Sequence, residues 1–235
     1  MNDTLHQVSL LQALVNSYYD GIISVGELKK LGDVGIGTFN GADGEMIFVD
    51  NKVYKARIDG KVLEVKDDET IPFANSCTFI TDDKIKLNVE NMAKLKTTLN
   101  RYRDRSYKNL FIVFRIKGVF KKMVVRTIPK QNKPYNPLSA VVENEQRLFT
   151  KSNVEGTIIG FLFPRFMREL NTGDVHMHFI SNDKTYGGHV LDLEFSQLDL
   201  EISIKRKLDL ILPNNDKFNN HNVIVSNKIV NKVEE

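Results

Sequence analysis

Features that would place this chain outside a reducing compartment are missing from its sequence. It has a single cysteine, Cys77, so it cannot form an internal disulfide, and one thiol suits a reducing compartment. The first residues lack the basic segment and the apolar run of a signal peptide. No stretch approaches the roughly 18 apolar residues of a transmembrane helix. These absences predict a cytoplasmic protein with no membrane partner.

Excess charge and the common catalytic motifs are also missing. The 33 basic and 30 acidic residues leave a net charge of +3, which is weak evidence for a polyanionic partner. A nucleic-acid surface would need interleaved exposed aromatic residues around the basic residues Lys117, Lys121 and Lys122, so we expect no nucleic-acid partner. The sequence has no P-loop, no Gly-x-Ser-x-Gly elbow and no Cys-x-x-Cys pair.

Three of the five histidines, by contrast, fall within one short stretch. His176 and His178 lie two positions apart, and His189 follows eleven positions after His178. Side chains alternate between the two faces of a strand, so a His-x-His pair puts two imidazoles on one face. Three imidazoles with an open fourth position are the ligand set of a catalytic zinc site.

The residues between His178 and His189 are rich in turn formers, which predicts a β-hairpin. The two histidines are symmetric about the Asp183-Lys184 bond, so a hairpin that closes there places them directly opposite each other. A Gly-Gly pair just before His189 offers a site for a bulge that would shift this register. Histidines packed in a sheet without a metal are the alternative, and the spacing favours the metal site.

The first part of the chain combines helical and β-type patterns. Apolar residues recur at helical spacing in 8–19 and 88–103. Ser24-x-x-Glu27 resembles a capping box that opens a short helix. Short β-type runs separated by Gly, Asn and Asp turns occupy much of 36–80. We therefore expect helices that frame a sheet.

A loop that holds three of the six prolines, 129–137, is the expected domain boundary. Before it, 110–128 is expected to form two or three strands broken near Gly118. After it, β-type runs surround the histidines. We predict an α+β fold with a mixed-sheet domain over 1–130 and a small antiparallel, β-barrel-like domain over 131–235 that carries the histidines.

Two further polar residues, Glu45 and Arg126, are candidates for a functional site. An Asp-Gly turn places Glu45 at the start of a strand, where its carboxylate can point into a cleft; an ordinary hairpin with an exposed glutamate is the alternative. Arg126 lies in an apolar strand, where an arginine usually needs a carboxylate or a substrate as partner. An edge-strand arginine that reaches solvent is the alternative there.

Taken together, these segments resemble the alpha-acetolactate decarboxylase family across essentially the whole chain. Shorter matching segments are Tyr19-Asp20-Gly21, Gly26-Glu27-Leu28, Gly35-Ile36-Gly37-Thr38, Asp43-Gly44-Glu45, Val125-Arg126-Thr127-Ile128-Pro129 and Gly156-Thr157-Ile158-Ile159-Gly160. The most specific match runs from His176-Met177-His178-Phe179-Ile180-Ser181 to Tyr186-Gly187-Gly188-His189-Val190-Leu191-Asp192.

The resemblance implies a zinc-dependent carboxy-lyase that converts 2-acetolactate to (R)-acetoin and carbon dioxide. It assigns the zinc ligands His176, His178 and His189, the catalytic residues Glu45, Arg126 and Glu234, and the substrate-binding residue Thr38. Glu235 is the alternative to Glu234, which the spacing from the preceding apolar residue favours. The resemblance also implies a homodimer and a C-terminal tail that closes the site.

The implied chemistry suits these residue types. Loss of carbon dioxide from a β-keto acid leaves negative charge next to a carbonyl, and a zinc ion can stabilise it as an enediolate. Neutral imidazoles preserve the positive charge of the ion, which thiolates would quench. Arg126 can hold the carboxylate or steady the enediolate. Glu45, Glu234 and Arg126 are the candidate proton donors.

Two other classes of protein remain possible from the sequence. One is a different metal-dependent β-barrel enzyme of the cupin type, which would use another metal and another substrate. The other is a binding module whose histidines are structural. Metal content separates the second class from an enzyme, because packed histidines do not require about one zinc ion per chain.

Overall fold

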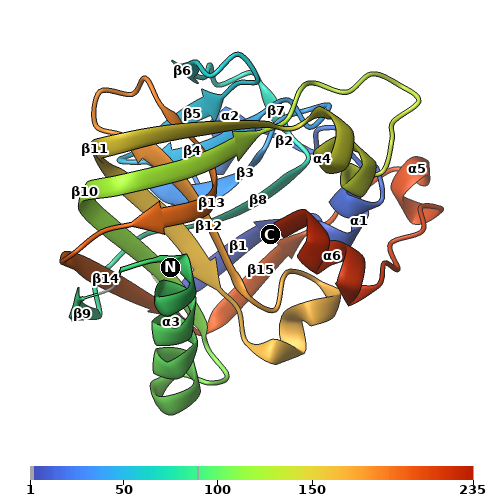
Figure 1. The fold of residues 1–235 in the computed structure, drawn as a ribbon. Coiled ribbons are helices and arrows are strands. Elements are labelled where there is room, and N and C mark those ends of the chain that lie inside the picture. Colours follow the sequence, from blue (N-terminus) through green and yellow to red (C-terminus); the bar gives the residue numbers. More distant parts are fainter. Residues whose placement is uncertain (1–2, 89, 235) are drawn as a thin grey trace.

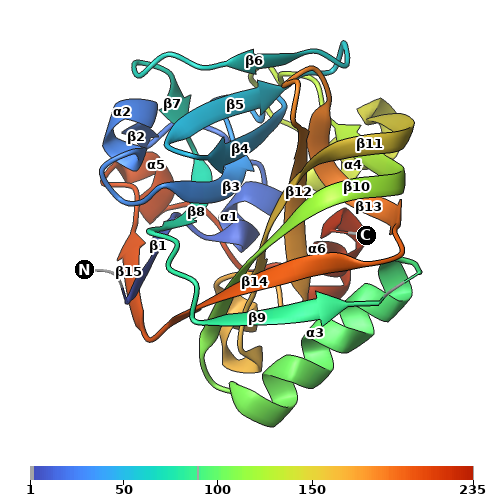
Figure 2. The same cartoon turned by 90° about the vertical axis from the view of Figure 1, so that its left-hand side faces the viewer.

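Two large β-sheets form the framework of the protein, as the computed structural model shows (Figures 1 and 2). The structure describes residues 3–88 and 90–234, apart from the side chains of residues 227, 231 and 234. The first sheet has seven strands, in the order β15 (Lys207–Ile211), β1 (Thr4–Val8), β8 (Phe73–Cys77), β3 (Val34–Thr38), β4 (Glu45–Val49), β5 (Lys52–Ala56) and β6 (Val62–Glu64). The second has six, in the order β11 (Arg147–Leu162), β12 (Val175–Ser181), β13 (Gly187–Glu194), β10 (Phe111–Thr127), β14 (Leu198–Lys205) and β9 (Asp83–Leu87). A small third sheet pairs β2 (Ile23–Ser24) with β7 (Thr70–Ile71).

Neither large sheet comes from one continuous part of the chain. β15 lies at the edge of the first sheet, parallel to β1, whereas β9 and β10 belong to the second sheet. All pairs in the second sheet are antiparallel, and the pairings of β10, β11, β12 and β13 close into a ring. The predicted α+β class is confirmed. The boundary near residue 130 and the barrel-like closure stay predictions.

β10 is one strand of 17 residues, so the predicted break near Gly118 is wrong. Its first half pairs with β14 and its second half with β13, while β11 follows it along most of its length. Gly118 has a φ of +148° and lies opposite Gly156, and a Cβ there would be 2.2 Å from Leu198 Cδ2. Gly118 therefore leaves room for the Leu198 side chain, and the chain does not turn at this glycine.

The helix predicted over 8–19 is much shorter in the structure. Residues up to Val8 form β1, and α1 covers only Leu11–Val15. All five residues of α1 are buried, so the apolar spacing reflects burial on several sides of the segment rather than one face of a long helix. The capping box is confirmed: Ser24 and Glu27 exchange both hydrogen bonds at the start of α2 (Val25–Leu28).

Three helices form an apolar cap beside the sheets, although they come from the start, the middle and the end of the chain. They are α1, α4 (Leu138–Glu145) and α6 (Asn227–Glu234), which lie together in Figure 1. The remaining helical elements are α3 (Met92–Ser106), the short 3-10 helix η1 (Arg165–Glu169) and α5 (Asp216–Asn219). Within residues 3–88 and 90–234, no helix is long and apolar enough to span a membrane.

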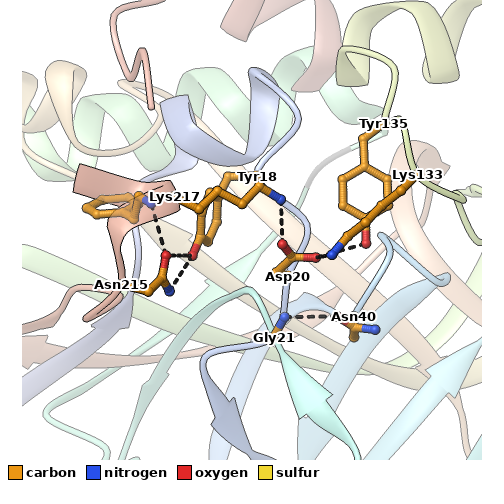
Figure 3. A network of polar contacts seen from close by, with 9 residues as sticks. Tyr18, Asp20, Gly21, Asn40, Lys133, Tyr135, Asn215 and Lys217 are labelled. Carbon is orange, nitrogen blue, oxygen red and sulfur yellow. Dashed lines mark hydrogen bonds and ion pairs between the residues drawn. The ribbon is translucent and has the colours of Figure 1, made fainter. Parts of the chain in front are cut away.

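A network around Asp20 anchors the C-terminal segment that leads to α6 (Figure 3). The Asp20 carboxylate accepts a hydrogen bond from the Tyr135 hydroxyl at 3.0 Å and pairs with the Lys133 ammonium at 2.9 Å. It also accepts a hydrogen bond from Lys217 on α5. The network therefore joins the start of the chain, the proline-rich loop and the C-terminal segment.

Candidate metal centre

The three histidines lie on one face of the hairpin formed by β12 and β13. His178 pairs directly with His189, as the symmetry of the turn predicts, and His176 lies two residues along β12. A register shift does occur in the pairing of β13 with its other neighbour, β10, where it falls between Val124 and Val125. The predicted hairpin register is therefore confirmed. All three histidines are buried, with exposures of 5% or less.

The three rings surround one point. Their centroids are 5.1 Å apart for His176 and His178, 5.0 Å for His176 and His189, and 5.4 Å for His178 and His189. One ring nitrogen from each lies within 4.8 Å of the others, so the group can hold a metal ion. His178 Nδ1 lies 2.7 Å from the carbonyl oxygen of Met46, which only accepts hydrogen bonds. Nδ1 therefore carries the proton, and Nε2 keeps the lone pair that faces the other histidines.

The surroundings keep the imidazoles of His176 and His178 neutral. Burial, with a smaller effect from the charge of Arg126, lowers the pKa of His176 to about 3. Burial also holds the pKa of His178 well below its usual value, and His176 lowers it further. Neutral imidazole is the form that binds a metal ion, so the donor set suits a cation at neutral pH.

Glu45 reaches the histidines from the first sheet. It is the first residue of β4, is 8% exposed, and its Oε2 lies 3.6 Å from His178 Nε2. The turn before it is held by Thr38, whose hydroxyl donates a hydrogen bond to the Gly44 carbonyl at 2.7 Å. Gly44 adopts a φ of +76°, which favours glycine. The predicted Asp-Gly turn therefore directs Glu45 toward the site.

Arg126 lies on β10 directly opposite His189 and is 4% exposed. Its Nη2 donates a hydrogen bond to the Val233 carbonyl on α6. The edge-strand alternative is wrong, because at Arg126 β10 pairs with β13 on one side and β11 on the other, and the side chain is buried. The structure thus brings a guanidinium group, Glu45 and the three imidazoles to one place.

All six described candidates line one small cavity of about 30 Å³: Thr38, Glu45, Arg126, His176, His178 and His189. The cap helices supply its apolar wall, through Leu11, Leu14, Leu138, Val142 and Val233. A volume of this size holds one or two water molecules. The part of this wall that α4 supplies was not predicted from the sequence. The apolar spacing of Leu138, Val141 and Val142 is the signal that could have revealed this helix.

The C-terminal end is only partly described. Glu234 is the last residue of α6, but its side chain lies outside the described part of the structure, as does all of Glu235. Val233, the residue before it, lines the cavity and accepts the hydrogen bond from Arg126. The tail thus reaches the site, and the choice between the two glutamates stays a prediction.

A profile described as alpha-acetolactate decarboxylase matches residues 5–224. The chain belongs to the alpha-acetolactate decarboxylase family. The alpha-acetolactate decarboxylase of Brevibacillus brevis is 38% identical to it, over 92% of this chain and 75% of the relative. That of Bacillus subtilis strain 168 is 39% identical, over 93% of this chain and 85% of the relative.

Solved structures agree with this membership. The crystal structure of alpha-acetolactate decarboxylase from Bacillus subtilis strain 168 has a TM-score of 0.92 at 35% identity, covering 98% of this chain and 99% of that chain. A Staphylococcus aureus protein, described as similar to alpha-acetolactate decarboxylase, has a TM-score of 0.89 at 29% identity and 98% coverage of both chains. The family resemblance is confirmed, and the protein is a carboxy-lyase, an acetolactate decarboxylase.

Proposed function

We propose that this acetolactate decarboxylase is zinc-dependent and forms (R)-acetoin and carbon dioxide, with His176, His178 and His189 as zinc ligands. The observation that carries the proposal is the set of three buried imidazoles around one point. Zinc–nitrogen bonds of about 2.0–2.1 Å at tetrahedral angles separate two ligand nitrogens by roughly 3.3–3.4 Å. The Nε2 atoms of His176 and His178 lie 3.3 Å apart, which fits.

Glu45 suits a fourth position in the same set. Its Oε2 lies 3.6 Å from His178 Nε2, close to the separation of two ligands of one zinc ion. A carboxylate added to three neutral imidazoles leaves the centre with a net positive charge. Zinc bound there would supply Lewis-acid stabilisation of the enediolate charge that remains when carbon dioxide leaves.

Arg126 would bind the substrate carboxylate. Its planar guanidinium can donate two parallel hydrogen bonds to a carboxylate, and its burial in the cavity wall strengthens them. The hydrogen bond from its Nη2 to the Val233 carbonyl fixes the orientation of the group. We propose that Thr38, which lines the same cavity, also contacts the substrate.

A proton must then reach one face of the substrate carbon to give a single enantiomer. The apolar wall excludes bulk water, so the donor is a side chain of the site. Glu45, Glu234 and Arg126 are the candidates, and Glu234 belongs to the helix that closes the cavity. Deleting residues 234–235 tests whether the proton donor lies in the tail. A loss of turnover with unchanged zinc content supports a donor in the tail, and normal turnover excludes a donor there.

The deciding experiment incubates the purified protein with racemic 2-acetolactate, with and without a chelator, and measures acetoin by chiral chromatography. We expect acetoin only in the zinc-loaded sample, and restored activity when zinc is returned. His178→Ala should lose both zinc and activity. His6→Ala, on β1 in the first sheet, is the matched control and should keep both. Full activity after chelation, or in His178→Ala, would exclude this metal site.

Family membership decides against the cupin-type enzyme and the non-catalytic binding module. We propose that the enzyme is cytoplasmic and forms a homodimer. We also propose that the ring of β10, β11, β12 and β13 forms a small barrel. The domain that carries the histidines would begin near residue 131.

A further inference from the structure

A second cavity, of about 470 Å³, reaches α6 and shares no lining residue with the metal centre. Its lining residues come from α3, from the segment around η1 and from α6. Val230 of α6 forms part of its wall, one turn before Val233 in the metal cavity. Its volume is many times that of one water molecule, about 30 Å³, so it has room for a hydrated ligand.

The lining carries excess positive charge. Three guanidinium groups, from Arg103, Arg165 and Arg168, face two carboxylates, from Asp104 and Asp174, which leaves a formal charge of +1. Asp104 is already engaged: its Oδ1 accepts a hydrogen bond from Arg103 Nε at 3.0 Å, and its Oδ2 lies 3.5 Å from Arg165. A cation bound at the carboxylates would be repelled by three arginines at short range.

Two of these arginines keep unused hydrogen-bond donors. Arg103 is only 3% exposed, and its Nη1 has no hydrogen-bond partner within the part of the chain that the structure describes. Leaving a buried charged donor unpaired is unfavourable. Arg168 is an exposed residue of the same lining, and among described side chains none forms an ion pair with its guanidinium.

We propose that this cavity binds a small oxyanion of the phosphate type, held by Arg103 and Arg168. Guanidinium groups donate paired hydrogen bonds in a fixed plane, which matches the oxygens of a phosphate group. The ion would balance the excess charge of the lining. Because Val230 lines the cavity, binding would also stabilise α6 in its place over the metal centre. The proposal does not depend on the identity of the catalytic metal.

Titration of the zinc-loaded enzyme with inorganic phosphate tests the site, with chloride holding the ionic strength constant. We expect saturable binding with a dissociation constant of about 1 mM or below. Arg168→Gln should weaken it at least about tenfold, because an exposed partner is lost without disturbing the core. Arg103→Lys keeps the charge but removes the planar pair of donors, so it should weaken binding as well.

Arg101→Gln is the matched control, because Arg101 is exposed on the same helix, α3, and does not line the cavity. It should bind phosphate like the unmodified enzyme. Hydrogen exchange should slow in α3 and α6 when phosphate binds, and not in Arg168→Gln. Equal dissociation constants in the unmodified enzyme, Arg168→Gln and Arg103→Lys would show binding elsewhere, for instance at the metal, and would overturn the proposal. So would the absence of saturable binding in the unmodified enzyme.

Discussion

Replacing Asp20 by asparagine should loosen the C-terminal segment of the enzyme. The carboxylate is the common partner of Lys133, Tyr135 and Lys217, which come from two other segments of the chain (Figure 3). Asparagine has nearly the same shape but no charge, so it cannot form two ion pairs and a charge-assisted hydrogen bond together. The change therefore removes one central electrostatic contact without removing bulk.

The expected cost follows from the exposure of the partners. Lys217 is 46% exposed, so its ion pair contributes about 0.5–1 kcal/mol after solvent screening. The hydrogen bond from Tyr135 ends on a carboxylate that is 25% exposed and contributes roughly the same. A loss of about 1.5 kcal/mol is expected, which lowers the melting temperature of a protein of this size by roughly 3–6 °C.

The pH dependence gives a second test. Partial burial raises the pKa of Asp20, but hydrogen bonds from Lys217, Lys133 and Tyr135 outweigh it and hold the pKa below its usual value. A lowered pKa in the folded state stabilises the fold above the usual value, near 3.9, and this stabilisation disappears as the pH falls through the folded pKa. The difference between the two proteins should be full at pH 7 and should disappear as the pH falls through the lowered pKa of Asp20.

Thermal unfolding followed by circular dichroism between pH 7 and pH 3 measures both effects. Asp209→Asn is the control, because Asp209 is 52% exposed and has one recorded partner, His6, and it should change the melting temperature by less than half as much. Equal melting temperatures for Asp20→Asn and the unmodified enzyme at pH 7 would refute the anchoring role. A difference that does not change with pH would refute its electrostatic origin.

Three further substitutions test the site and its support. Arg126→Gln should keep the metal, measured by elemental analysis, but lower kcat by about 100-fold or more, since the substrate carboxylate loses its charged partner; unchanged kinetics would exclude that role. Gly188→Ala should lower the free energy of unfolding by about 2 kcal/mol in a urea titration, because φ is +150° and the new Cβ would lie 2.5 Å from the Arg126 carbonyl oxygen. Tyr186→Phe should cost about 1–3 kcal/mol in the same assay, because the buried hydroxyl, which has one hydrogen to donate, lies 2.8 Å from the carbonyl oxygens of both Met123 and Phe149; a loss below about 0.5 kcal/mol would contradict this account.

Local sequence patterns predicted the metal centre where the geometry is local. The pairing of His178 with His189 depends only on the period of two along a strand and on the position of the turn, and both are visible in the sequence. The same holds for the capping box of Ser24 and Glu27, whose partners are three residues apart. Short-range chemistry of this kind needs no knowledge of the rest of the fold.

Contacts between distant segments were beyond these patterns. Glu45 and Arg126 reach the histidines from different strands; local patterns marked them as candidates, but only the family resemblance placed them in one site with the histidines. The long strand β10 was divided at Gly118, because a glycine that admits the Leu198 side chain has the same appearance in a sequence as one that turns the chain. The helix over 8–19 was overextended for a similar reason: burial on all sides produces apolar spacing that resembles one helical face.

The cavity around the histidines has room for one or two water molecules, which is less than a five-carbon acid needs. Because α6 packs against α1 and α4 at the wall of this cavity, we expect substrate entry to require a displacement of α6. We therefore expect the local unfolding equilibrium of α6 to affect catalysis. Conditions that fray this helix would speed admission of substrate while shortening the time during which the reacting carbon is sheltered.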